Sequence, residues 1–265
     1  MSTYVVTGTD GIARAVALAR LRAGDTVVVV GRNAERGESL LGAGDAVFLR
    51  ADLSLVGETR RVAAEIAERF PVIDGLVLCA QHGRSARLET AEGLENTFAL
   101  YYLSRRVLAD ALAVPLERAA RPVVINVCAP GVDAGEIHWD DLQLRGGYAL
   151  MTAILQGSRL NDLLGVAHGT RPGRTRYALV NPGGVATSFS GEYDAETTAA
   201  IERMRESARP VDEAVLPILA LLTDPPADKI GAYAQGERIA MDGPAFDPAA
   251  AERLRALTDD LLSRV

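Results

Sequence analysis

The chain has 265 residues, of which 48% are hydrophobic and 24% charged, a composition typical of one large globular domain with a sizeable core. Its formal net charge of −7 opposes a nucleic-acid surface, and no apolar stretch approaches the length of a membrane span. Cys79 and Cys128, the two cysteines, lie in apolar runs, which opposes a disulfide framework and favours a reducing compartment. Because the first strand is expected from Tyr4, we expect no signal peptide and a cytoplasmic protein without membrane or nucleic-acid partners.

Apolar runs of strand length alternate with segments of helical period along most of the chain. The strand candidates are Tyr4–Thr7, Thr26–Val30, Ala46–Leu49, Gly75–Cys79, Val123–Cys128 and Arg176–Val180. The helix candidates between them are Ile12–Ala23, Val56–Arg69, Leu94–Ala113 and Ala149–Ala167. Continuously apolar strands separated by helices predict a doubly wound parallel sheet of the Rossmann-like α/β class.

Beyond Pro182-Gly183-Gly184 the pattern becomes mainly helical. We expect a helical insert at Ala195–Ala208, a helix after Pro210, a strand near Gly231–Gln235 and a last helix from Pro248. No repeat, linker or shift in composition divides the chain. Residues 1–265 are therefore predicted to form a single domain with a helical substrate flap at about residues 188–210.

A glycine turn joins the first strand to the first helix. The segment VVTGTDGIARAVALA places Gly8 and Gly11 where unpaired backbone N–H groups and the helix dipole can hold a pyrophosphate. Such turns also occur without a ligand, so this feature alone leaves the question open. Arg32, after the second strand, suits the 2′-phosphate of NADP(H), with a solvated surface arginine as the alternative. Asp52, after the third strand, could hold the adenine or cap a turn.

The order of these motifs resembles the short-chain dehydrogenase/reductase superfamily over essentially the whole chain. The segments that carry the resemblance are TGTDGIA, GRN, ADLS, LVLCAQHG, TFALYYL, VVINVCA, LQGSRLND and NPGGVATSF. The NADPH site that the resemblance implies consists of Thr7, Gly8, Asp10, Gly11, Ile12, Arg32, Asn33, Asp52, Leu53, Cys79, Ala80, Gln81, Arg159, Pro182, Gly183, Val185 and Thr187. Within it, Thr187 would reach the nicotinamide carboxamide. The implied substrate residues are Ala129, Leu155, Phe189, Ser190 and Tyr193.

The chain departs from this family at the residues that perform catalysis. The glycine turn is one residue shorter than the family's and ends in Ala13. The family's Asn, Ser, Tyr and Lys fall by the resemblance on Tyr101, Ala129, Leu155 and Arg159, so none of the four is retained. Arg159 is predicted to bind the nicotinamide ribose, with a surface helix arginine as the alternative. The loss of a positioned general acid lowers a reaction rate by about 10² to 10⁴.

Three tyrosines are candidates to replace the lost acid. Tyr148 lies two helical turns, about 10 Å, before Leu155, too far to substitute directly. Tyr101 is conceivable as a donor, although a tyrosine that fills core space is the favoured interpretation. Tyr193 belongs to the flap, where an exposed tyrosine on a mobile segment is the alternative. None of the three is persuasive.

Histidines and metal ligands offer no replacement either. His82 and His138 lie on expected loops and have no carboxylate spaced to form a dyad. No Cys/His cluster has metal-ligand spacing, so we expect no metal.

The remaining source of oxyanion stabilisation is the substrate. A ketone beside an enolic or phenolic hydroxyl carries its own donor, and a charge-assisted internal hydrogen bond contributes about 1.5–3 kcal/mol. Aromatic polyketides such as angucyclinones contain such hydroxy ketones, and a chain with Lys229 as its single lysine is typical of a GC-rich genome. The chain resembles atypical antibiotic-pathway ketoreductases of the simocyclinone kind, which reduce angucyclinones at position 7.

We therefore predict an NADPH-dependent ketoreductase whose partner is a small polyketide-like substrate. Two other functions stay open: an NADP(H)-binding pseudoenzyme or sensor, and a non-redox cyclase or dehydratase on the same fold. The long segments Leu94–Ala113 and Ala149–Ala167 could pack as a dimer bundle, but they carry charged residues, so the oligomeric state also stays open.

Overall fold

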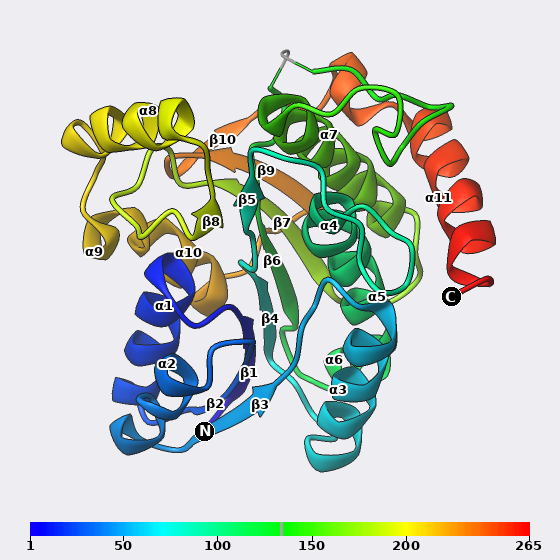
Figure 1. The fold of residues 1–265 in the computed structure, drawn as a ribbon. Coiled ribbons are helices and arrows are strands. Elements are labelled where there is room, and N and C mark those ends of the chain that lie inside the picture. Colours follow the sequence, from blue (N-terminus) through cyan, green and yellow to red (C-terminus); the bar gives the residue numbers. More distant parts are fainter. Residues whose placement is uncertain (133–134) are drawn as a thin grey trace.

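The computed structural model describes residues 1–132 and 135–265, shown in Figure 1. Within these residues, eight strands form one sheet in the order β10-β9-β7-β6-β4-β1-β2-β3. The strands are β1 (Thr3–Thr7), β2 (Thr26–Gly31), β3 (Ala46–Arg50), β4 (Gly75–Leu78), β6 (Val123–Val127), β7 (Arg176–Asn181), β9 (Ile230–Ala234) and β10 (Glu237–Ile239). Only the β9–β10 pair is antiparallel within the described sheet. The reversal of strand order at β1 confirms the predicted Rossmann-like α/β fold.

Helices cover both faces of this sheet (Figure 1). One face carries α3 (Val56–Arg69), α5 (Ser104–Ala111), α7 (Leu150–Gly169) and α11 (Pro248–Leu262), and the other carries α1 (Gly11–Arg22) and α10 (Leu216–Thr223). The shorter helices are α2 (Ala34–Glu38), α4 (Asn96–Phe98), α6 (Ala113–Glu117) and α9 (Val211–Ala214), with 3₁₀ turns η1 (Leu41–Ala43) and η3 (Pro244–Phe246).

The apolar character of the central strands follows from burial on two sides. Val5 packs into the core on the side of α3 and α7, whereas the next residue, Val6, packs into the core on the side of α1. Successive side chains of a strand point to opposite faces, so a strand covered on both faces is apolar at every position.

The predicted helix Leu94–Ala113 is divided in the structure. It consists of α4, a π-helical turn η2 (Ala99–Leu103) and α5. Short π-helical turns occur mostly as single bulges inside helices, frequently at functional sites. The divided helix places Tyr101 inside the wider turn.

The predicted flap begins after β7 and carries the helix α8 (Ala195–Glu206), drawn in yellow in Figure 1. A short strand, β8 (Gly191–Glu192), precedes α8 and pairs in parallel with β5 (Gly83–Arg84). No local pattern in the sequence predicts this pair of strands. Within the described residues, no helix combines the length and apolar character that crossing a bilayer requires.

Candidate active site

A cavity of about 1270 Å³ opens at the carboxyl ends of β1, β2, β4 and β6. Loops after these strands form its floor, and residues of α7, α8 and the segment after β7 form its walls. Ligand pockets commonly measure about 300–1,000 Å³, so this cavity is large for a single small molecule. Its position at the reversal of strand order is where doubly wound sheets bind ligands.

The glycine turn forms one end of the cavity because two of its residues need left-handed backbone. Gly8 has φ of 105° and Gly11 has φ of 51°. A Cβ atom on Gly11 would stand 2.8 Å from Cγ2 of Thr187, so the segment after β7 closes directly over the turn. The shortened turn therefore lies against Thr187, at the N-terminus of α1.

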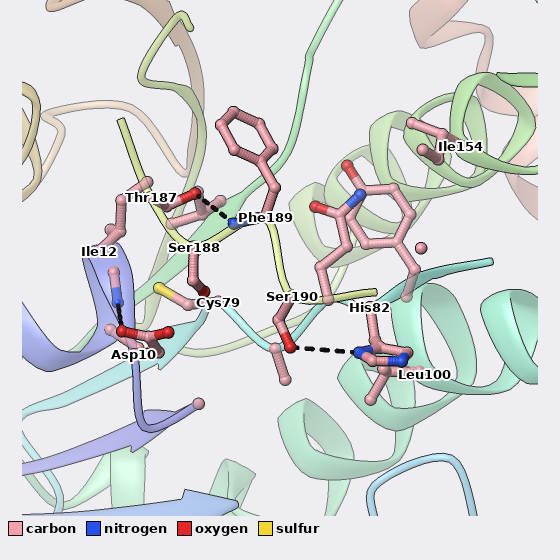
Figure 2. Close-up of a pocket in the computed structure, with 18 of the residues that line it drawn as sticks. Asp10, Ile12, Cys79, His82, Leu100, Ile154, Thr187, Ser188, Phe189 and Ser190 are labelled. Atoms are coloured by element: carbon pink, nitrogen blue, oxygen red, sulfur yellow. Dashed lines mark hydrogen bonds between the residues drawn. The ribbon is translucent and has the colours of Figure 1, made fainter. Parts of the chain in front are cut away.

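Asp10 caps the helix that follows this turn. Its carboxylate accepts the backbone N–H of Gly11 at 2.8 Å (Figure 2) and pairs with the guanidinium of Arg36 at 2.7 Å. Burial acts to raise the pKa of Asp10, but hydrogen bonds with Ser188 and Gly11 and the charge of Arg36 hold it below its usual value. The carboxylate is therefore ionised, and Arg36 offsets its charge at the mouth of the turn.

Two arginines lie at this rim of the cavity. Arg32 follows β2, is 41% exposed and lies 3.6 Å from the carboxylate of Asp52. Arg36 lies in α2, which Asn33 caps by accepting the backbone N–H of Arg36 at 2.9 Å. Sequence reasoning missed Arg36, although a second arginine four residues after Arg32 was a readable signal.

Most predicted site residues line this one cavity. Those of the predicted nucleotide site are Gly8, Asp10, Gly11, Ile12, Arg32, Asn33, Leu53, Cys79, Ala80, Gln81, Pro182, Gly183, Val185 and Thr187. Those of the predicted substrate site are Ala129, Phe189, Ser190 and Tyr193. The structure thus brings together residues from both ends of the chain, while their roles as ligands stay predictions.

Three predicted nucleotide residues lie outside the cavity, and two of them, Thr7 and Asp52, serve the fold. The hydroxyl of Thr7 accepts the backbone N–H groups of Cys79 and Ala80 at 3.0 and 3.1 Å, which ties the end of β4 to β1. Asp52 accepts both the N–H and the hydroxyl of Ser54, at 2.9 and 2.7 Å. These hydrogen bonds give Thr7 a role in the fold, while its role as a ligand stays a prediction, and they favour the turn-capping interpretation of Asp52.

The predicted α7 residues Leu155 and Arg159 are not among those that line the cavity. Leu155 packs toward Gly135, and Arg159 donates to the carbonyl of Pro244 at 3.1 Å and pairs with Asp162 at 3.3 Å. The α7 residues that line the cavity include instead Ile154 and Ser158. Both pairs have the same spacing of four residues, so periodicity alone could not choose between them.

The residues that line the cavity decide the chemistry of this wall. Arg159 is not among them, and its guanidinium contacts Pro244 and Asp162, so its binding of a ribose stays a prediction. Ile154 presents no proton, and Ser158 presents a hydroxyl where the earlier register expected none. Asp162, three residues after Arg159, was a readable signal, since side chains three apart on a helix attract one another when oppositely charged.

The flap segment is fixed by a set of local contacts. Phe189 has φ of 43°, a left-handed conformation uncommon for a residue with a side chain. The hydroxyl of Thr187 accepts the N–H of Phe189 at 3.3 Å, and Ser190 lies 3.3 Å from Nδ1 of His82 (Figure 2). Arg205 of α8 donates to the carbonyl of Thr187 at 2.8 Å. These contacts hold the segment 187–190 against the cavity.

Tyr148 and the described metal-ligand groups add nothing to this site. Tyr148, which was expected to be too far from Leu155 to replace the acid, precedes α7 and donates to the carbonyl of Arg84 at 3.0 Å. In residues 1–132 and 135–265, no group of three or more His, Cys, Asp or Glu side chains is arranged to hold a metal ion.

The sheet order and the glycine turn beneath a cleft at the strand ends define the class of doubly wound nucleotide-binding folds. A family model described as short chain dehydrogenase matches residues 2–140. The chain therefore belongs to the short-chain dehydrogenase family.

Curated relatives lie within the same family of oxidoreductases. The chain is 32% identical over 207 residues, 71% of this chain and 70% of the other, to a Streptomyces sp. (strain C5) protein described as "Putative daunorubicin C-13 ketoreductase DnrU". It is 31% identical over 53% of its length to retinol dehydrogenase 13 from Homo sapiens, covering 45% of that protein.

Solved structures share the fold at lower identity. An uncharacterized protein from Mycobacterium paratuberculosis matches with a TM-score of 0.76 and 22% identity, over 98% of this chain and 93% of that one. A short chain dehydrogenase from Burkholderia cenocepacia in complex with NADP matches with a TM-score of 0.66 and 20% identity, over 89% and 96%.

Proposed function

We propose that this chain is an NADPH-dependent ketoreductase that acts on an aromatic polyketide hydroxy ketone of the angucyclinone type. One observation supports this most directly: the glycine turn and the two rim arginines open into the same cavity as the apolar walls of α7 and the flap. The similarity to the described C-13 ketoreductase, and the NADP complex of a fold neighbour, support the same reading.

The residues present fit a phosphorylated dinucleotide. A Cβ atom on Gly8 would lie 3.0 Å from Cβ of Ala13, so this close approach of the turn to helix α1 is open only to glycine. Arg32 and Arg36 supply two guanidinium groups for a 2′-phosphate, which arginine binds well through its fork of N–H donors. When bound, NADPH supplies a hydride to the carbonyl carbon of the substrate. Gly8, Gly11 and Thr187 hold its pyrophosphate and carboxamide side in this proposal.

The protein's share of the mechanism is positioning. Ala129 and Ile154 line the substrate side of the cavity and offer no proton, so the neighbouring hydroxyl of the substrate stabilises the developing alkoxide. The flap residues Phe189 and Tyr193 exclude water from the reacting carbonyl. Because an internal charge-assisted hydrogen bond contributes about 1.5–3 kcal/mol, the substrate hydroxyl raises the rate by about 10- to 150-fold.

The cofactor part of the proposal is tested by thermal shift with NADPH, NADH and no cofactor. NADPH is expected to raise the melting temperature and NADH to do so less, since a ligand that binds only the folded state stabilises it. Arg32→Ala and Arg36→Ala are each expected to reduce the preference. Equal shifts with both cofactors would remove the phosphate assignment.

The substrate part is tested with two matched ketones, 8-hydroxy-1-tetralone and 1-tetralone, by following NADPH absorbance. The hydroxy ketone is expected to react at least 10-fold faster. Equal rates would overturn the role of the substrate hydroxyl.

The aliphatic side chain of Ile154 cannot donate a proton to a substrate, which also favours a second candidate function, a pseudoenzyme that binds NADP(H) and signals its presence. Thermal stabilisation by NADPH together with no oxidation of it by any hydroxy ketone would favour this candidate.

A further inference from the structure

We propose that Tyr101 is the proton donor of this site, acting together with the hydroxyl of Ser158. This inference rests on the proposed ketoreductase function and adds a donor to it. Tyr101 comes from the π-helical turn η2 and Ser158 from α7, and both line the cavity. Their hydroxyl oxygens lie 3.2 Å apart, within hydrogen-bonding distance.

The surroundings of Tyr101 are shaped for its ring. A Cβ atom on Gly157 would stand 2.4 Å from Cδ1 of Tyr101, so the ring lies in space that only glycine leaves open on α7. The side-chain amide of Asn161 donates to the carbonyl oxygens of Tyr101 and Gly157, both at 2.8 Å. Glycine, serine and asparagine on one helix therefore fix the ring and hold its hydroxyl beside that of Ser158, and both residues line the cavity.

A buried cation lies against the other side of the ring. Arg105 is 1% exposed, and its guanidinium carbon lies 4.4 Å from the centroid of Tyr101. Its hydrogen bonds go to the side chain of Asn126 and to the carbonyls of Val127 and Ala80. Among residues 1–132 and 135–265, no carboxylate forms an ion pair with Arg105, and its Nε has no hydrogen-bond partner. A buried cation without an anion favours negative charge on its neighbours.

The balance of these effects defines the role of the phenol. Burial raises the pKa of Tyr101 to about 12, while Arg105 and the hydrogen bond with Ser158 act to lower it. The phenol is therefore protonated at neutral pH and can give a proton but not take one. Arg105 then stabilises the phenolate that remains, which is the state with the greatest need of a cation.

The proposed step conserves atoms and electrons. When bound, NADPH would supply a hydride, with its electron pair, to the carbonyl carbon, and the π pair of the C=O bond would move to oxygen. The alkoxide takes the proton of the Tyr101 hydroxyl, which is favourable because an alkoxide is a stronger base than a phenolate. The phenolate regains a proton from bulk water through the hydroxyl of Ser158. A hydroxyl on the substrate shares the alkoxide by hydrogen bonding, while Tyr101 supplies the net proton.

The test compares Tyr101→Phe with a matched control, Tyr102→Phe. Tyr102 is the next residue and is 1% exposed, against 3% for Tyr101. Its hydroxyl lies 2.8 Å from that of Thr258, and neither residue lines the cavity. Each variant removes one buried phenolic hydroxyl and keeps the ring. In single-turnover oxidation of NADPH with 1-tetralone, Tyr101→Phe is expected to lower the rate by about 10²-fold or more and Tyr102→Phe by less than threefold.

A binding measurement gives a readout that does not need turnover. The dye 4-nitro-1-naphtholate, ionised at pH 8, has the ring skeleton of the tetralone product and places an oxyanion where the alkoxide forms. With NADP⁺ present, its Kd is expected to rise about 10-fold in Tyr101→Phe and Ser158→Ala and to stay unchanged in Tyr102→Phe.

The outcomes separate the two proposals. Naphtholate that binds Tyr101→Phe and Tyr102→Phe equally, or a wild-type hydride-transfer rate in Tyr101→Phe, would overturn the role of Tyr101. A wild-type protein that oxidises NADPH with neither tetralone would overturn the ketoreductase function, while the naphtholate comparison would still decide on Tyr101.

Discussion

Gly157 sets two opposing effects against each other, and their balance can be measured. Replacement of a glycine inside a helix by alanine stabilises the helix by about 1 kcal/mol. In Gly157→Ala, however, the new Cβ atom would stand 2.4 Å from Cδ1 of Tyr101, against an ordinary contact distance of about 3.5–4.0 Å. The ring must therefore move by about 1 Å, and overpacking of this kind costs about 1–3 kcal/mol. We expect a net loss of about 1 kcal/mol.

A double-mutant cycle tests this explanation. In a Tyr101→Ala background the atoms that the new Cβ would meet are absent, so Gly157→Ala is expected to stabilise the protein by up to about 1 kcal/mol, the intrinsic helix preference. Urea unfolding of the four proteins gives the free energies, provided that the m-values agree. If Gly157→Ala stabilises both backgrounds by the same amount, the close packing of Gly157 against Tyr101 is refuted.

Three further predictions concern pH and the flap. Burial raises the pKa of Asp162 to about 7. As pH rises above about 4 the carboxyl ionises first in the unfolded state, so the free energy of unfolding of the wild type falls by up to about 4 kcal/mol by pH 7. Asp162→Asn removes this fall, and urea unfolding at pH 5 and pH 8 will show that the difference in free energy between the two proteins widens with pH. Burial lowers the pKa of His168 to about 4, so the free energy of unfolding falls by up to about 3 kcal/mol as pH drops from 6.5 toward 4. His168→Gln should lack this fall, and a loss of stability of the same size between pH 6.5 and pH 4 in the variant would contradict the prediction. Glu192→Gln removes the exposed ion pair with Arg84 but keeps the backbone pairing of β5 with β8, so the rate of proteolysis within α8 should rise by less than about fivefold. A larger increase would mean that the ion pair itself holds the flap.

The sequence was sufficient for most strands and long helices because their signals are local. Runs such as Val27–Val30 are apolar at every position, which is the pattern expected of a strand buried on both faces. The glycine turn and Arg32 also follow from local sequence, because each occupies a fixed place relative to a strand end.

The wall of the cavity formed by α7 could not be assigned in the same way. Ile154 with Ser158 and Leu155 with Arg159 have identical spacing, and the choice depends on how the helix rotates against Tyr101 and η3. The guanidinium of Arg159 pairs with Asp162 and donates to the carbonyl of Pro244, and Pro244 lies 85 residues from Arg159 in the sequence. Such rotation is a property of tertiary packing.

The pairing of β5 with β8 joins two parts of the molecule that the sequence keeps far apart. β5 follows Cys79, Ala80 and Gln81 after one intervening residue, His82, and β8 leads into α8. A molecule that binds against this loop therefore also positions β8, the strand that leads into the flap. We expect ordered binding as the kinetic consequence: the coenzyme binds first and leaves last, and the ketone binds only after the coenzyme has positioned the flap.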